Sequence, residues 1–212
     1  MISLGLDPSL RGFGWCVHDG LATASQRVLS KGVWSTSPRS IWVERYVSLR
    51  EEVGRLLDSN PAIEAVGVES PPFGEQYSEG LYALFLMVNE AVWSRRRDVV
   101  YFDPGTVKML VKEDPRARKG KMFKSDMVDA ARADTQIKKW NHNEADAYHI
   151  GRFASRFWLL QRGVLAESEL TPAEHQAFAR VHTFSRGKRA GQTVRSGALF
   201  KEGQRFFRFS AL

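Results

Sequence analysis

The opening of the chain, residues 2–15, reads ISLGLDPSLRGFGW and decides the fold. Apolar residues alternate with small ones from position 2 to position 6, which is typical of a strand packed on both faces. Pro8 and Gly12 then predict a tight turn, after which a second strand returns beside the first. Asp7 therefore ends a strand and opens onto a cleft, although an aspartate beside proline is also typical of a simple turn.

Length and composition limit the class of protein. The 212 residues suffice for a buried core, in one domain with an appendage or in two small domains. Cys16 is the single cysteine, which excludes disulfides within the chain and thiolate metal sites and favours a reducing compartment. The sequence shows no signal-peptide pattern and no apolar run long enough to cross a bilayer, so we expect a soluble cytoplasmic protein without a membrane partner.

The positive charge is unevenly distributed along the chain. Residues 1–150 contain 20 Lys or Arg and 20 Asp or Glu, whereas residues 151–212 contain 11 and 4 and therefore carry the whole net charge of +7. A basic tail on a neutral body suits a polyanion such as nucleic acid, because neutralised phosphates release their counterions. The alternative is an ordinary solvated surface.

The first two thirds of the chain alternate predicted strands and helices. After the opening pair, strands are expected at residues 27–34, 63–68 and 99–102. Ser37 and Pro38 predict the start of a helix whose core stripe is Trp42, Tyr46, Leu49, Val53 and Leu56. Residues 81–93 are apolar nearly all round and predict a buried helix.

Four later helices are predicted from their caps. Asp103 precedes a proline at a first helical position and is interpreted as structural. Ser125 is expected to cap a helix over 126–133, and Asn141 is expected to cap the helix that follows it. In the tail, Thr171 opens a capping box that predicts a short helix to about residue 181.

Two further carboxylates have positions comparable to that of Asp7. Glu69 ends the strand over 63–68 and precedes two prolines, and Asp146 lies in the early turns of a helix. On that helix Asn143 and His142 share the face of Asp146, whereas Glu144 points elsewhere. Carboxylate oxygens hold Mg²⁺ or Mn²⁺ and not zinc, so the three carboxylates predict a site for such an ion.

The most basic local run surrounds Gly120. It consists of Arg116, Arg118, Lys119, Lys121 and Lys124. It is not a phosphate-binding P-loop, because the earlier glycine is missing and no Ser or Thr follows the lysine. Beside a carboxylate cleft, such a loop would receive a DNA backbone; otherwise it is solvated surface.

Taken in order, several motifs resemble the RuvC-type Holliday junction resolvases of the ribonuclease H-like superfamily. They are Gly5-Leu6-Asp7-Pro8 with Gly12 and Gly14, Val68-Glu69, Val107-Lys108, Lys124-Ser125 and Glu144-Ala145-Asp146-Ala147. The resemblance covers about residues 1–158. It implies an α/β ribonuclease H-like domain with a mixed five-stranded sheet flanked by helices, followed by a basic C-terminal extension over 159–212.

The resemblance also implies an activity. The expected protein is a homodimeric crossover junction endodeoxyribonuclease that resolves four-way DNA junctions by paired nicks, with two Mg²⁺ ions and a 5′-phosphate product, in DNA recombination and repair. Asp7, Glu69 and Asp146 correspond to the catalytic, metal-binding carboxylates. Lys108, Lys121 and Lys124 correspond to lysines that contact DNA or support catalysis.

The sequence departs from the family at Asn143, where the family has an acidic residue or a histidine. Asparagine can ligate through its amide oxygen or position a water, but it carries no charge. His142 is the alternative ligand, or else a cap or surface residue. Phe73 lies in the loop after Glu69, where the family presents an aromatic residue that stacks at the junction centre, although the spacing differs.

Other interpretations stay open at this point. A non-catalytic branched-DNA-binding relative is favoured if Asn143 abolishes metal binding. Another ribonuclease H-like nuclease shares the same opening motif, and so does an actin-like ATPase, which is disfavoured because no second phosphate-binding glycine turn is present. In the tail, residues 199–209 suggest a hairpin whose Phe206, Phe207 and Phe209 are interpreted as packing residues and not as base-stacking platforms.

Overall fold

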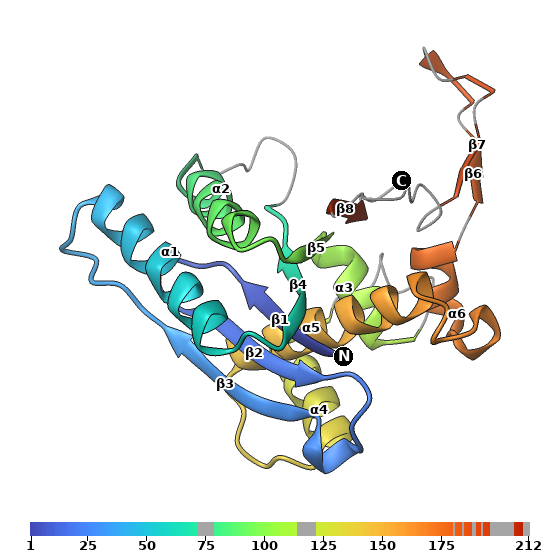
Figure 1. Cartoon of the computed structure of the whole chain (residues 1–212), viewed down its shortest axis with the longest axis horizontal. Helices are drawn as coiled ribbons and strands as arrows, with labels where there is room; N and C mark the ends of the chain where they lie inside the picture. The colour runs from blue at the N-terminus through green and yellow to red at the C-terminus, as the bar shows by residue number, and fades with distance from the viewer. Residues whose placement is uncertain are drawn as a thin grey trace.

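The computed structural model describes most of the chain. The described ranges are residues 1–71, 79–113, 122–179, 181–183, 185–187, 190–191, 193–195 and 206–209. In these ranges a central sheet lies between helices packed on its two faces (Figure 1). No helix among them is apolar over the length that a bilayer crossing requires.

The central sheet has the strand order β3-β2-β1-β4-β5-β8. Its strands are β1 (Ile2–Asp7), β2 (Phe13–Asp19), β3 (Val28–Trp34), β4 (Ile63–Glu69), β5 (Asp98–Phe102) and β8 (Phe206–Phe209). The first three strands form an antiparallel meander, whereas β4, β5 and β8 continue the sheet in parallel with β1. The predicted mixed sheet of five strands is therefore confirmed, and the tail adds a sixth strand.

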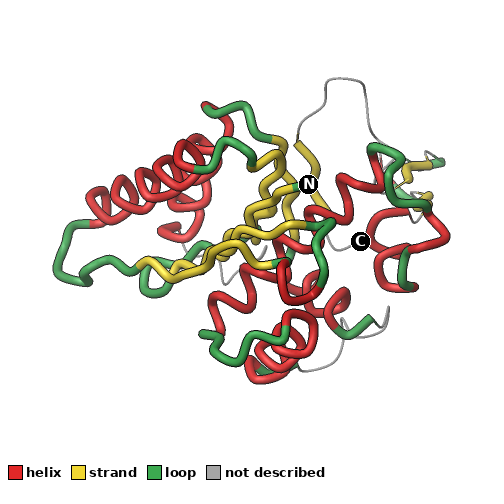
Figure 2. Tube along the Cα trace, turned by 60° about the horizontal axis from the view of Figure 1, so that its bottom comes forward, coloured by secondary structure: helices red, strands yellow, loops and turns green. Residues whose placement is uncertain are grey.

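Helices cover both faces of this sheet. They are α1 (Trp42–Ser59), α2 (Glu79–Ser94), α3 (Pro104–Val111), α4 (Lys124–Thr135), α5 (His142–Gln161) and α6 (Pro172–Glu174), the last continuing as a π-helical turn over His175–Ala179. One apolar core joins α1 and α2 to the sheet, and another joins α5 to the opposite face together with α3 and α4. Figure 2 shows the strands between these helical layers.

Glycines let α5 lie unusually close to the sheet. A Cβ atom on Gly5 of β1 would stand 1.8 Å from the carbonyl oxygen of Ala147, and one on Gly14 of β2 would stand 2.0 Å from that of Asn143. Real Cβ atoms do not approach a backbone oxygen so closely, so larger residues at these positions would push the helix away. The distance between α5 and the sheet thus depends on two residues of the opening stretch.

Two helix starts differ from the prediction. Ser37 does not cap α1: its Oγ accepts the Arg39 N–H at 3.2 Å within a turn, and the helix begins only at Trp42. Because Trp42 lies at that first position, it is exposed and not part of the core stripe. Ser125 likewise does not cap α4, since Phe123 holds the cap position.

The prediction that residues 81–93 form a fully buried helix was wrong for one face. Leu84 and Val88 are buried against the sheet, whereas Tyr82, Leu86 and Trp93 are 42%, 51% and 64% exposed. Because residues 81–93 are nearly all apolar, the sequence did not show which face of this helix packs on the sheet and which face points outward. The helix α2 therefore presents an apolar outer stripe.

The tail contributes short elements. The helical segment predicted after Thr171 is present, and Thr171 Oγ1 accepts the Glu174 N–H at 3.2 Å. The strands β6 (Val181–Thr183) and β7 (Thr193–Arg195) form a separate antiparallel pair. The hairpin expected over 199–209 stays a prediction, because residues 199–205 lie outside the described ranges. The division at residue 158 is also untested, and α5 continues past it to Gln161.

Candidate active site

Three carboxylates line one cavity of about 310 Å³. Asp7 and Glu69 are the last residues of β1 and β4, which are neighbouring parallel strands, so their side chains lie at the same edge of the sheet. Asp146 comes from the second turn of α5, which packs on β1 and β2. The structure therefore brings together the three carboxylates that the sequence predicted as one site.

Burial strongly disfavours the charged forms of these carboxyl groups. It raises the pKa of Asp7 from 3.8 to about 7, with a further contribution from the charge of Asp146. The pKa of Asp146 rises to about 6 for the same first reason, although Lys124 and Lys108 oppose the shift. Burial, then the charges of Asp7 and Asp146, also raise the pKa of Glu69 well above its usual value. All three groups can therefore be ionised together at neutral pH only beside a positive partner.

Two lysines supply part of this positive charge. Lys108 of α3 and Lys124 at the start of α4 line the same cavity. Both lower the pKa of Asp146, and Lys108 lowers that of Glu69. The cavity therefore combines carboxylates from the sheet and α5 with ammonium groups from α3 and α4.

The start of α5 is held by a network that orients Asp146. Asn141 caps the helix: its Oδ1 accepts the Asn143 N–H at 3.0 Å, and its own N–H donates to Glu144 Oε2 at 2.9 Å. The same Glu144 oxygen forms an ion pair with Lys31 of β3 at 2.6 Å. The Lys31 ammonium also lies 4.7 Å from the ring centre of Trp140. These contacts fix the first turn of α5 to the sheet beside the cavity.

The structure separates the two candidates for a fourth ligand. Asn143 lines the cavity with Asp146, whereas His142 does not belong to its lining. Burial, then the charge of Lys124, lowers the pKa of His142. Of the two, Asn143 is the residue placed to reach an ion between the carboxylates.

The donor set fits a hard divalent cation. Carboxylate and amide oxygens are the ligands that Mg²⁺ and Mn²⁺ prefer, and a bound cation would relieve the raised pKa values of Asp7, Glu69 and Asp146. Within the described ranges, no group of three or more His, Cys, Asp or Glu side chains is already arranged around a single metal position. The residues therefore suit the ion chemically, and their oxygens must turn toward it on binding.

Several predicted DNA contacts cannot be placed. Phe73 lies outside the described ranges, and so do four residues of the basic run, which are Arg116, Arg118, Lys119 and Lys121. Lys124, the last member of that run, does line the cavity. The DNA-binding role of this set stays a prediction.

The solved structures that resemble this chain include two of RuvC. RuvC of Thermus thermophilus in complex with a Holliday junction substrate is 24% identical, with a TM-score of 0.59 over 72% of this chain and 90% of that one. A second Thermus thermophilus RuvC structure is 23% identical, with a TM-score of 0.60 over 77% of this chain and 97% of that one. This chain has a RuvC-type fold. No family model and no curated protein matches the sequence.

Sequence reasoning missed two parts of this site. Lys31 holds Glu144 across 113 residues of sequence, and no local pattern connects them. Phe123 was not considered as a site residue, although it precedes Lys124 and lines the same cavity. The sequence offers one signal for Phe123: it is an apolar residue at a helix cap, where Ser, Thr, Asp or Asn is usual.

The raised pKa values predict how stability depends on pH when no divalent ion is bound. A carboxyl group with a folded pKa of about 7 and an unfolded value near 3.8 binds more protons in the folded state between these values. The contribution of such a group to the free energy of unfolding should therefore fall as pH rises from about 4 to about 7. Buried His18 and His149, whose pKa values burial lowers to about 4, contribute in the opposite direction up to about pH 6.5, so a comparison of two proteins is needed to isolate the carboxyl group. In urea unfolding with a chelator, Asp7→Asn should therefore gain stability relative to the wild type as pH rises from about 4 to about 7.5.

Asp98→Asn is a suitable control, because Asp98 carries a carboxylate on the same sheet and does not line the cavity. A stability difference between Asp7→Asn and the wild type that stays constant from about pH 4 to about pH 7.5 would contradict the electrostatic description of the site.

Proposed function

We propose that the protein is a Mg²⁺-dependent endonuclease that cleaves branched DNA and resolves Holliday junctions by paired nicks. The observation that carries this proposal is the meeting of Asp7, Glu69 and Asp146 in one cavity of a RuvC-type fold, beside Lys108 and Lys124. Oxygen ligands next to ammonium groups suit a phosphodiester with its divalent counterions. The fold is shared by a protein solved with a junction substrate, which supports this choice of DNA.

Asp7, Glu69, Asp146 and Asn143 are the proposed metal ligands. Bound between them, two Mg²⁺ ions, or Mn²⁺ in their place, would supply an activated water and charge stabilisation at the leaving oxygen. Hydrolysis forms a bond from water to phosphorus and breaks the bond to the 3′ oxygen, which leaves a 5′ phosphate and a 3′ hydroxyl. Lys124 and Lys108 are proposed to hold the phosphate oxygens, and Lys124 to support the chemistry.

The DNA is proposed to continue from the cavity over basic parts of the chain. The basic run at Arg116, Arg118, Lys119 and Lys121 directly precedes α4, and residues 151–212 carry a charge of +7. These groups would neutralise phosphates without reading sequence. Phe73, in the loop after Glu69, is proposed to stack at the junction centre.

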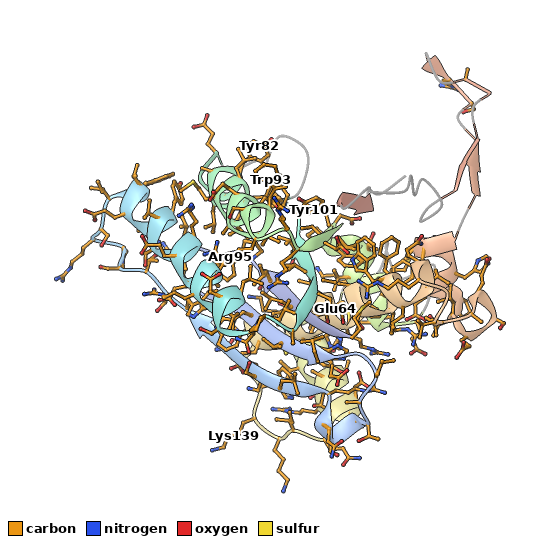
Figure 3. The ribbon with its side chains drawn as sticks, viewed as in Figure 1. Glu64, Tyr82, Trp93, Arg95, Tyr101 and Lys139 are labelled. Carbon is orange, nitrogen blue, oxygen red and sulfur yellow. The ribbon has the colours of Figure 1, made fainter. Side chains whose placement is uncertain are left out.

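Paired nicks require two active sites, which supports a homodimer. The outer stripe of α2 is a suitable contact surface, because Tyr82, Leu86 and Trp93 are separated by four and seven residues, the spacing of a helix–helix seam. Tyr82 and Trp93 are labelled on α2 in Figure 3. Two-fold pairing of α2 would cover the same stripe on both copies.

A non-catalytic branched-DNA-binding relative is the second candidate, favoured by one observation. Asn143 lies in the cavity without a charge, and this weakens the binding of a second cation. The two candidates share the fold and the DNA, and they differ only in whether the bound strand is cut.

Asp146→Asn should abolish cleavage and leave junction binding intact, because it replaces a proposed metal-binding carboxylate with a neutral amide of similar size. Cleavage of a four-way junction, a flap and a linear duplex would be measured with Mg²⁺, alongside binding by gel shift. Asp129→Asn serves as a control, because Asp129 is an exposed carboxylate of α4 outside the cavity. Near-normal cleavage by Asp146→Asn would overturn the site, and binding without cleavage by the wild type would favour the non-catalytic candidate.

Asn143→Asp should lower the Mg²⁺ concentration needed for half-maximal activity, because it restores a charge three residues from Asp146 on the same helical face. Activity would be titrated against Mg²⁺ and Mn²⁺ at saturating junction DNA. His142→Ala should leave the metal midpoint unchanged. A strong shift with His142→Ala and none with Asn143→Asp would instead make His142 the ligand.

Trp93→Glu should convert the dimer to a monomer, because a charge within a buried apolar seam is costly. Sedimentation would compare it with Trp42→Glu, which changes an exposed tryptophan of α1 that lies outside the α2 stripe. A monomeric wild type, or a dimer that survives Trp93→Glu, would contradict this surface.

A further inference from the structure

The cavity is lined by two chemically different groups of residues. Carboxylates and lysines form one group, and the other is apolar, consisting of Pro104, Val107, Met122, Phe123 and Met127. A metal–phosphate site needs only the first group. The volume of about 310 Å³ lies in the range of small-molecule sites, so the apolar group leaves room for more of a nucleotide than its phosphate.

Phe123 is the exposed member of the apolar group. Its side chain is 66% exposed, whereas Val107 and Met127 are buried in the core. An exposed phenylalanine gains little from packing, and its ring cannot accept the hydrogen bond that a helix cap normally provides. A phenylalanine at this position therefore gives α4 no side-chain cap and adds nothing to the hydrophobic core.

The backbone of Phe123 is nevertheless held firmly. Its N–H donates to Asp126 Oδ2 at 2.9 Å, and its carbonyl oxygen accepts the Asp126 N–H at 3.1 Å. The ring is thus presented from a fixed helix start, directly before Lys124. An aromatic face and an ammonium group on adjacent residues match a nucleobase and the phosphate attached to its sugar.

We propose that Phe123 forms a nucleobase subsite, in which its ring stacks on a base next to the scissile phosphate. This inference rests on the proposed function and adds a contact that selects the substrate. Every base has a π-face, so the stacking does not depend on sequence. A base must leave its own stack to reach the ring, and this costs least at a branch point or an unpaired nucleotide. The subsite therefore favours branched DNA over a continuous duplex.

The test uses the full-length protein with a junction that carries 2-aminopurine beside the phosphodiester cut by the wild type. An Asp146→Asn background keeps this DNA intact. The parent protein and its Phe123→Tyr variant should raise the fluorescence of this base on binding, because the base leaves the DNA stack that quenches it, whereas Phe123→Leu and Phe123→Ala should raise it much less. Because the ring is proposed to stack on one base, Phe123→Ala and Phe123→Leu should each weaken junction affinity by about fivefold or more.

Phe123→Leu separates stacking from apolar contact, because it keeps an apolar side chain without the aromatic face. Trp42→Ala is the matched control: it removes an exposed aromatic residue that does not line the cavity, and it should leave fluorescence and affinity unchanged. In the catalytically intact protein, Phe123→Leu should reduce the preference for junction over linear duplex. Circular dichroism of each variant confirms that it is folded.

A fluorescence change with Phe123→Leu equal to that of the parent protein would overturn the subsite, and so would unchanged affinity of both Phe123→Leu and Phe123→Ala. These outcomes leave the proposed function standing if the wild type still cuts junctions and Asp146→Asn does not. Absence of metal-dependent cleavage by the wild type would instead overturn the proposed function itself.

Discussion

The desolvation of three partly buried carboxyl groups is the constraint on which the site depends. Asp7, Glu69 and Asp146 lose hydration at the edge of the sheet, which raises their pKa values. Neighbouring negative charge adds to the shift for Asp7 and Glu69, whereas lysines oppose it for Asp146. Such a cluster persists only when the surrounding structure fixes its positions. Two of the groups are fixed by adjacent parallel strands, and the third by a helix packed across them.

The helix α5 is held in that position by contacts of two kinds. Gly5 and Gly14 remove the side chains that would separate it from the sheet, which permits the close approach. The Lys31–Glu144 ion pair, with side chains only 20% and 15% exposed, then attaches its first turn to β3. The position of Asp146 thus depends on a close backbone contact between α5 and the sheet and on a partly buried ion pair.

The sequence predicted those features that depend on neighbouring residues. Strand ends at Asp7 and Glu69 and the caps at Asp103 and Asn141 follow from local patterns, and all four are present. The exposure of Trp93 and the pairing of Lys31 with Glu144 were not predictable, because they depend on which faces meet across distant elements. A hairpin was expected over 199–209, but the pairing of β8 with β5 was not predictable for the same reason, since the two strands lie more than a hundred residues apart.

Asn143 leaves the cavity with one negative group fewer than an acidic residue would. In the proposed nuclease, this affects how strongly metal binding and DNA binding depend on each other. A family-like acidic residue there would give four negative groups, whereas this chain has three, opposed by Lys108 and Lys124. Two divalent cations would leave such a cavity with excess positive charge. A phosphodiester bound between the lysines and the carboxylates restores negative charge where the ions lie. In the proposed nuclease, full metal occupancy should therefore be coupled to DNA binding, because each partner lowers the electrostatic cost of the other.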